Sequence, residues 1–178
     1  MTRTLYLLRH AKSDRSGPDA ALKDHPRPLS RRGRKDAERI AARFAADALT
    51  VDRVYCSTAK RTRETFDLVR KGLDNPPASF RDALYLAPAE DLIAFVQAIP
   101  DTVKSAMLIG HNPGLHDAAL MLVGRAGRGQ AEALDRLRTK YPTGALCALS
   151  FDVPSWKKVG MGLGTMTAFV RPRDLDDG

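Results

Sequence analysis

Two histidines and two arginines are the residues of this sequence best suited to phosphate chemistry. His10 directly follows Arg9, His111 follows Gly110, and Arg61 lies four residues after Ser57. A guanidinium group matches phosphate oxygens in paired hydrogen bonds and stays charged at any working pH. A neutral imidazole can take a phosphoryl group and then lose it to water, which splits one difficult step into two. Brought to one place, these residues would transfer a phosphoryl group while the arginines neutralise its oxygens.

The predicted strands end where these residues begin. Apolar runs at 4–8, 51–56 and 106–109 have the length and composition of buried strands. Arg9 and His10 follow the first run, Arg61 lies one helical turn past the second, and His111 follows the third. In open α/β sheets, ligands bind beyond the carboxyl ends of the strands. We therefore expect these residues to meet at one edge of a sheet.

The remaining pattern alternates helices with strands. Ser30 and Thr58 are predicted to cap helices, and Pro88 to open a third helix. Further helices are expected at 115–123 and 131–140, further strands at 78–81, 145–151 and 167–170, and loops at 12–28 and 124–130. The predicted buried face of the helix after Ser30 is Ala37, Ile40, Ala41, Phe44 and Ala48. That of the helix after Thr58 is Thr62, Phe66, Val69 and Leu73, and that of the helix after Pro88 is Leu92, Phe95, Val96 and Ile99. This alternation predicts one α/β domain over residues 1–178, with a mostly parallel central sheet and helices on both faces.

Several motifs resemble the histidine phosphatase superfamily. The run Leu8-Arg9-His10-Ala11 looks like its RHG signature, residues 57–65 look like its second arginine segment, and Gly110-His111-Asn112-Pro113 looks like its second histidine segment. Residues 28–33 fit the start of the family's first helix, and residues 86–91 are most similar to the SixA-like phosphohistidine phosphatases. The resemblance implies a phosphoglycerate mutase-like fold, with His10 as nucleophile. It also implies that Arg9, Arg61 and His111 bind phosphate, with His111 stabilising the transferred group; Asn112 and Ser13 are further candidates for substrate binding.

The sequence departs from the wider family at two points, the residue after His10 and the proton donor. Ala11 replaces the usual glycine, and there is no clear counterpart of the glutamate that protonates leaving groups in the mutase-like members. Glu90 and Asp91 are the nearest candidates, although both are typical of the first turn of a helix. An alkoxide leaving group needs a proton, whereas an imidazole departs with a pKa near neutrality. We therefore expect a phosphatase for phosphohistidine on a protein, with a small-molecule phosphoester phosphatase as the alternative.

Other classes of function are less well supported. His111 and His116 are five residues apart and face different sides of a helix, and there is no HExxH motif, so no metal or other cofactor is expected. The formal net charge of +8 suits any anionic partner, but aromatic residues make up only 6% and no nucleic-acid-binding motif is present. A mutase is less well supported, because the acid and the substrate-gripping insertions usual in mutases are not evident in this sequence. A non-catalytic module that binds phosphoproteins or nucleic acid remains the alternative from another class.

Composition predicts a cytoplasmic protein. Of the 178 residues, 43% are apolar and 28% are charged, and the two cysteines, Cys56 and Cys147, lie far apart. No stretch reaches the roughly 18 apolar residues of a membrane span. Substrate discrimination is expected from residues 12–28, which include Lys12, Asp14 and His25, and from residues 124–141. Nothing in the sequence specifies an oligomeric state.

Overall fold

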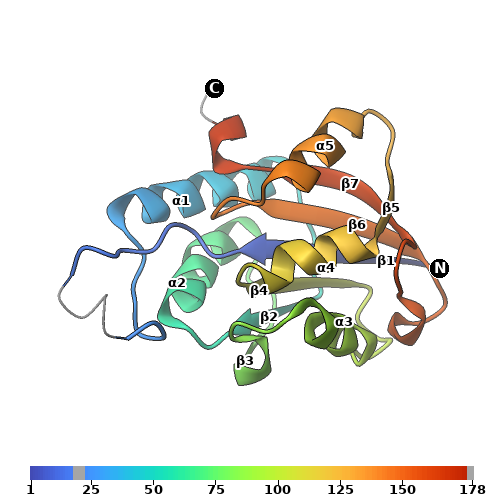
Figure 1. Ribbon diagram of the computed structural model, residues 1–178, viewed down its shortest axis with the longest axis horizontal. Helices are drawn as coiled ribbons and strands as arrows, with labels where there is room; N and C mark the ends of the chain where they lie inside the picture. The colour runs from blue at the N-terminus through green and yellow to red at the C-terminus, as the bar shows by residue number, and fades with distance from the viewer. Residues whose placement is uncertain (18–22, 176–178) are drawn as a thin grey trace.

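A seven-stranded sheet forms the centre of the computed structural model, which describes residues 1–17 and 23–175 (Figure 1). The strand order is β3-β2-β4-β1-β6-β7-β5, and all strands except β6 run in the same direction. The strands are β1 (Thr2–Arg9), β2 (Arg53–Ser57), β3 (Ala78–Arg81), β4 (Ser105–Gly110), β5 (Val123–Ala126), β6 (Leu146–Asp152) and β7 (Gly164–Val170).

Helices cover both faces of this sheet, as predicted. The helices α1 (Arg31–Ala46) and α2 (Lys60–Val69) pack on one face; α3 (Ala89–Gln97), α4 (Gly114–Leu122) and α5 (Ala131–Thr139) pack on the other. Short 3-10 turns are η1 (Arg70–Gly72), η2 (Asp82–Leu84), η3 (Trp156–Lys158) and η4 (Pro172–Leu175). The fold class expected from the sequence is confirmed.

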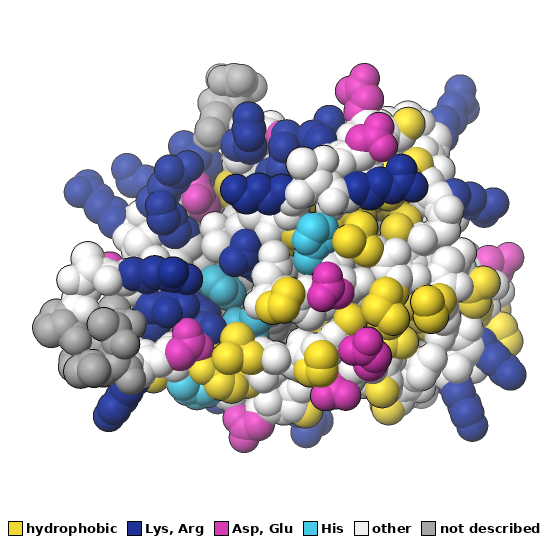
Figure 2. Space-filling view, viewed as in Figure 1, with side chains coloured by type: hydrophobic (Ala, Val, Ile, Leu, Met, Phe, Trp, Pro, Cys, Tyr) yellow, Lys and Arg dark blue, Asp and Glu magenta, His cyan; other side chains and the backbone are white. Residues whose placement is uncertain are grey.

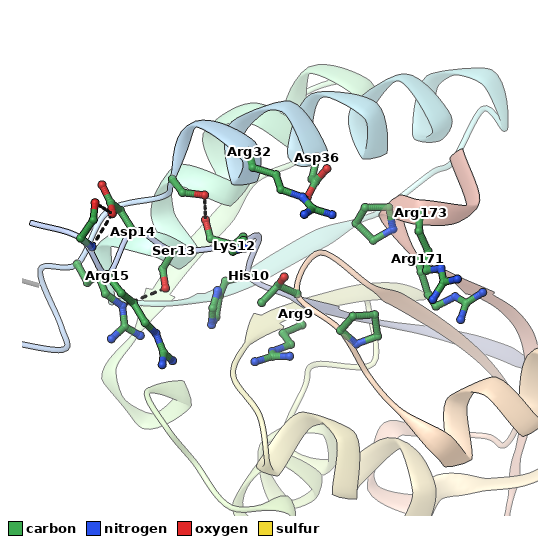
Figure 3. A pocket seen from close by; sticks show the side chains of 16 residues that line it. Arg9, His10, Lys12, Ser13, Asp14, Arg15, Arg32, Asp36, Arg171 and Arg173 are labelled. Atoms are coloured by element: carbon green, nitrogen blue, oxygen red, sulfur yellow. Dashed lines mark hydrogen bonds and ion pairs between the residues drawn. The ribbon is translucent and has the colours of Figure 1, made fainter. Parts of the chain in front are cut away.

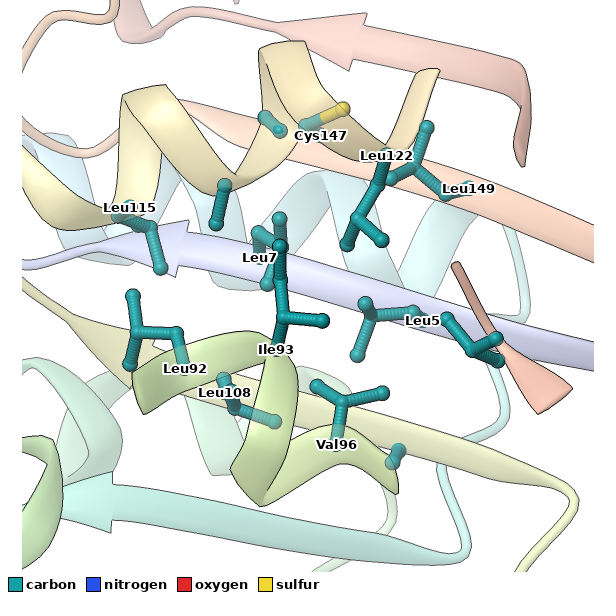
Figure 4. Packing of buried hydrophobic residues seen from close by; sticks show 14 of the residues in the cluster. Leu5, Leu7, Leu92, Ile93, Val96, Leu108, Leu115, Leu122, Cys147 and Leu149 are labelled. Carbon is teal, nitrogen blue, oxygen red and sulfur yellow. The ribbon is translucent and has the colours of Figure 1, made fainter. Parts of the chain in front are cut away.

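The central strand β1 shows why its sequence is continuously apolar. Successive side chains of a strand point to opposite faces, so Leu5 and Leu7 join the core under α3 and α4, whereas Tyr6 and Leu8 join the core under α1 and α2. Figure 4 shows Leu5 and Leu7 packed among side chains of α3, α4 and the neighbouring strands. A strand buried on both faces has no polar alternation, which is typical of parallel sheets.

Strand register sets the level at which the chain leaves the sheet. Arg9 of β1 is paired with Gly110 of β4, so His10 and His111 leave adjacent strands at the same height. On the other side of β4, Cys56 of β2 is paired with Ile109, which brings Ser57 level with Gly110. The carboxyl ends of three neighbouring strands therefore converge on one point.

Several expected boundaries are corrected by the structure. Ser30 caps α1 as predicted, because its hydroxyl accepts a hydrogen bond from the Gly33 N–H, but α1 ends at Ala46 and leaves Ala48 exposed. Thr58 does not cap α2, because its hydroxyl donates to Asp82 instead. The expected loop 124–130 is wrong in its first part, since Val123–Ala126 forms the edge strand β5.

The other helices follow their apolar patterns with small shifts. Pro88 precedes α3 as its N-cap residue, Ile99 lies beyond the end of this helix, and Phe95 is only partly buried. The expected loop 12–28 is irregular where it is described, and its residues 18–22 lie outside the described part of the chain. Among the described helices, none is long and apolar enough to span a lipid bilayer.

Candidate active site

His10 lies at the end of β1 with its imidazole buried and held in one orientation. Its Nδ1 is 2.7 Å from the Ala11 carbonyl oxygen, and because a carbonyl can only accept, Nδ1 carries the proton. The lone pair is thereby left on Nε2. Burial, together with the charges of Arg61 and Arg9, lowers the pKa of His10 to about 3. His10 is therefore a neutral imidazole with a nucleophilic nitrogen at physiological pH.

His111 faces His10 from the end of β4, with ring centroids 5.4 Å apart. Its Nδ1 lies 3.2 Å from Nη2 of Arg61, and a guanidinium can only donate, so Nδ1 is the acceptor. Nε2 then carries the proton and donates to the Ser57 hydroxyl at 2.7 Å. Burial first, and Arg61 second, lower the pKa of His111 to about 3. This ring is also neutral in the free protein.

Arg61 lies in the first turn of α2 and is 2% exposed. Nη1 donates to the Asp24 carbonyl oxygen and Nη2 to the Asp24 carboxylate, each at 2.9 Å. The Tyr85 hydroxyl donates to the same carboxylate. Partial burial opposes ionisation of Asp24, but the hydrogen bonds from Tyr85 and Arg61 outweigh it and lower its pKa below the ordinary value. A phosphate approaching Arg61 must therefore compete with an ionised carboxylate.

Arg9 and Asn112 are joined through one backbone carbonyl. Nη1 of Arg9 and Nδ2 of Asn112 both donate to the carbonyl oxygen of Tyr141 at 2.9 Å. The Tyr141 side chain is buried, and its hydroxyl donates to the Leu7 carbonyl oxygen of β1. Tyr141 is thus fixed to the sheet by its hydroxyl, and its carbonyl oxygen positions Arg9. Oδ1 of Asn112 and Nε of Arg9 are buried and have no hydrogen-bond partner among the described residues.

The backbone around His10 is tied to the elements that carry the arginines. The His10 N–H donates to the Gly110 carbonyl oxygen, which joins the ends of β1 and β4. The Ala11 N–H donates to the Thr65 hydroxyl, which in turn donates to the Arg61 carbonyl oxygen at 2.7 Å. Any movement of α2 would therefore displace both His10 and Arg61.

A cavity of about 740 Å³ opens over Arg9 and His10 and is lined by Ser13 and by further basic side chains (Figure 3). The figure shows the His10 ring lying between Arg9 on one side and Arg15 on the other. Arg27 donates to the Ser13 hydroxyl at 3.0 Å and forms an ion pair with Asp24 at 3.1 Å. The loop after β1 therefore adds Arg15 and Arg27 to the positive charge above His10.

The structure brings together His10, Arg9, Arg61, His111 and Asn112, all singled out from the sequence, and places Ser13 on the cavity wall. Glu90 and Asp91 are exposed in the first turn of α3. Sequence reasoning missed the partners that hold these residues, namely Asp24, Tyr85 and Tyr141, as well as Arg15 and Arg27. His10, Arg9, Arg61 and His111 could be identified because each lies just after a predicted strand. Ser57, at the end of β2, has the same kind of position.

In the described ranges 1–17 and 23–175, no three His, Cys, Asp or Glu side chains are grouped so that they could hold a metal ion. The charge that faces His10 is supplied by guanidinium groups, which can neutralise phosphoryl oxygens directly.

Known proteins share this fold and sequence pattern. Residues 5–85 match the histidine phosphatase superfamily (branch 1), a stretch that includes His10 and Arg61. An uncharacterized protein of Mycobacterium tuberculosis is 34% identical over 166 residues, covering 93% of this chain and 100% of that protein.

Solved structures resemble the whole chain. A candidate phosphohistidine phosphatase SixA from Nakamurella multipartitia has a TM-score of 0.80 at 26% identity and covers 97% of each chain. The protein histidine phosphatase SixA complexed with tungstate has a TM-score of 0.76 at 20% identity, covering 97% of this chain and 99% of that chain.

Proposed function

The chain belongs to the histidine phosphatase superfamily, and from this premise we propose that it hydrolyses phosphohistidine on a protein by way of a phosphorylated His10. The observation that carries the proposal is the neutral, buried imidazole of His10, whose Nε2 keeps its lone pair and whose ring lies in the field of Arg61 and Arg9. A nucleophile of this kind needs no base to activate it.

In the first step, the Nε2 lone pair of His10 attacks phosphorus. The new P–N bond forms as the bond to the leaving group breaks, and the electron pair of that bond departs with the leaving group. The charge of the three remaining phosphoryl oxygens is met by Arg9 and Arg61, with Asn112 as a further partner. His111 joins them when its Nε2–H turns from the Ser57 hydroxyl to a phosphoryl oxygen. The hydrogen bond from Nδ1 to the Ala11 carbonyl oxygen holds the ring and stabilises the positive charge that develops on it.

In the second step, water attacks the phosphorus of phosphorylated His10. The P–N bond breaks, its electron pair returns to Nε2, and the proton lost by water leaves with inorganic phosphate or passes to solvent. Neutral His10 is thereby restored. The positions of the arginines are unchanged, because backbone carbonyls and Asp24 hold them before substrate arrives.

The carboxylates near the site favour a substrate whose leaving group needs little help from an acid. Asp24 has a lowered pKa and is ionised at neutral pH, so it accepts hydrogen bonds and does not donate a proton. Glu90 and Asp91 are exposed on α3. Phosphohistidine releases an imidazole with a pKa near neutrality, which suits such a site better than an alkyl phosphate does. The SixA structure that holds tungstate, an oxyanion, supports oxyanion binding by this fold.

We further propose that the enzyme works without a metal ion and acts in the cytoplasm. The guanidinium groups of Arg9 and Arg61 take the role that a cation has in other phosphatases. Cys56 and Cys147 are both buried free thiols, and burial raises the pKa of each to about 12, which supports a protein that keeps its cysteines reduced.

The test is hydrolysis of para-nitrophenyl phosphate, of an alkyl phosphate and of a phosphohistidine-bearing peptide, all with chelator present. We expect wild type to cleave the phosphohistidine peptide and the aryl phosphate, and to cleave the alkyl phosphate at least about 100-fold more slowly. His10→Ala should be inactive while keeping the wild-type fold, and His116→Gln, on α4 outside the cavity, should retain activity.

Two results would contradict the mechanism. If His10→Ala stayed active, His10 would not be the nucleophile. If rapid quenching of wild type trapped no acid-labile phosphoryl group on the protein, the phosphohistidine intermediate would be wrong. Equal turnover of alkyl phosphate and phosphohistidine would leave the mechanism in place and overturn the substrate class.

A further inference from the structure

The cavity above His10 holds more positive charge than one phosphoryl group requires. Beyond Arg9, the cationic residues that line it are Lys12, Arg15, Arg27, Arg32, Arg171 and Arg173, whereas its acidic lining residues are Asp14 and Asp36. We name this cavity, with these lining residues, the basic trough. It runs from the loop after β1, past the start of α1, to η4 near the C-terminus (Figure 3).

The charge of the basic trough is assembled by the fold. Arg15 comes from the loop after β1, Arg32 from α1, and Arg173 from η4, so residues far apart in the sequence line one surface. In Figure 2, Lys and Arg side chains gather over α1 and η4, while apolar and acidic side chains gather over α3 and α4. A solvated basic helix face would not need contributions from three separate elements.

Part of this charge is left without an internal partner. Within the described residues, the side chains of Lys12, Arg15 and Arg173 form no hydrogen bond or ion pair, and Arg32 approaches Asp36 only at 3.9 Å. Arg171 is different, because its guanidinium donates to the Asp174 carboxylate at 2.6 to 3.1 Å. A concave surface lined mainly by cations concentrates the positive electrostatic field and attracts anionic partners.

The arrangement suits an extended series of anionic groups better than a second compact phosphate. A bound phosphate requires guanidinium forks that converge on one point. Here the fork of Arg171 is already occupied by Asp174, while Arg15 and Arg173 lie toward opposite ends of the trough, with His10 and Arg9 between them in Figure 3. Carboxylates spaced along a polypeptide can meet such separated cations one at a time.

We propose that the basic trough binds an acidic segment of the phosphorylated protein next to the phosphohistidine that enters the site. The proposal rests on the proposed function, because it places the segment beside a phosphoryl group that His10 attacks. Charge pairing across an exposed interface raises the association rate and sets partner choice. Arg32 and Arg173 are then specificity-determining residues for the hydrolysis of phosphohistidine.

The experiment compares two synthetic phosphohistidine peptides of equal length, one with Asp and Glu flanking the phosphohistidine and one with Asn and Gln. The readout is the ratio of kcat/KM for the acidic peptide to that for the neutral peptide. The test variant is Arg32→Gln/Arg173→Gln. The matched control is Lys157→Gln/Lys158→Gln on η3, which removes the same charge outside the trough.

For wild type we expect a ratio of about 10 at low salt, falling toward 1 at high salt as the charges are screened. The Arg32→Gln/Arg173→Gln variant should reduce the ratio at least about threefold, and the control should keep it. A wild type that cleaves both peptides equally would overturn the trough assignment while the proposed function stands. A wild type inert on both peptides and on aryl phosphate would overturn both. A preference for small bisphosphates in place of acidic peptides, lost in the test variant, would reassign the trough to a small ligand.

Discussion

Acidification is expected to destabilise the fold through two buried histidines. Burial, with the nearby guanidinium charges, lowers the pKa of His10 and of His111 to about 3. In the unfolded chain a histidine titrates near about 6.5, so the unfolded state binds more protons below that pH. Stability from these rings is therefore fully present above about pH 6.5 and is lost progressively as the pH falls toward 3.

The size of the effect follows from the two pKa values. At pH 5 the unfolded ring is almost fully protonated and the folded ring is neutral, which costs about 2 kcal/mol per histidine relative to pH 8. Two rings give about 4 kcal/mol, a large share of the roughly 5–15 kcal/mol that stabilises a typical domain. Carboxylates titrate near about 4, so they add little above pH 5.

The assay is urea denaturation between pH 8 and pH 5, followed by the fluorescence of Trp156, which is buried and is the only tryptophan. His10→Gln and His111→Gln should each lower the slope of unfolding free energy against pH by up to about 1.4 kcal/mol per pH unit, whatever they do to stability at pH 8. The reasoning fails if wild-type stability is flat over this range, or if both variants keep the wild-type slope.

Two further perturbations test how the site is held. Asp24→Asn removes the ionised carboxylate that competes for Arg61. The inhibition constant of inorganic phosphate, measured against hydrolysis of an aryl phosphate, should therefore fall about fivefold. An unchanged or higher constant would contradict this competition. Gly33→Ala would place a methyl group 2.0 Å from the Lys12 carbonyl oxygen, which should cost at least about 2 kcal/mol of unfolding free energy and lower kcat. The control Gly17→Ala, whose methyl group would have nothing within 4 Å, should leave stability unchanged. Equal stability of the two variants would show that the contact at Gly33 is unimportant.

The residues proposed to react were predictable because their positions follow from strand register. A buried strand reveals itself by an apolar run, and the residue after the run must leave the sheet at its carboxyl edge. Pairing of Arg9 with Gly110 then makes His10 and His111 neighbours, although they are far apart in the chain. Arg61 needs only one more step, because the first turn of α2 begins where β2 ends.

The groups that hold those residues were not predictable by the same means. Tyr141 contributes its carbonyl oxygen to Arg9, and any residue type has a carbonyl, so no sequence pattern marks this role. Asp24 lies in a polar loop where an aspartate is ordinary, and only the tertiary structure brings it to Arg61. Thr58 has the side chain of a helix cap, but Asp82 of η2 offers its hydroxyl a better partner across the fold.

In the proposed mechanism, the charges that bind phosphate also prepare the nucleophile. Burial is the largest cause of the low pKa of His10 and His111, and the charges of Arg61 and Arg9 add to it. The cations proposed to attract the substrate therefore help to keep the imidazoles neutral before it arrives. A phosphoryl dianion reverses this field, since it neutralises the guanidinium groups and favours positive charge on the rings beside it. The imidazolium proposed to form at His10 as the P–N bond is made would then be stabilised by the phosphoryl group that it has just taken. Arginine suits both roles because it stays charged when buried, whereas a lysine in the same place would lower its own pKa and release the proton.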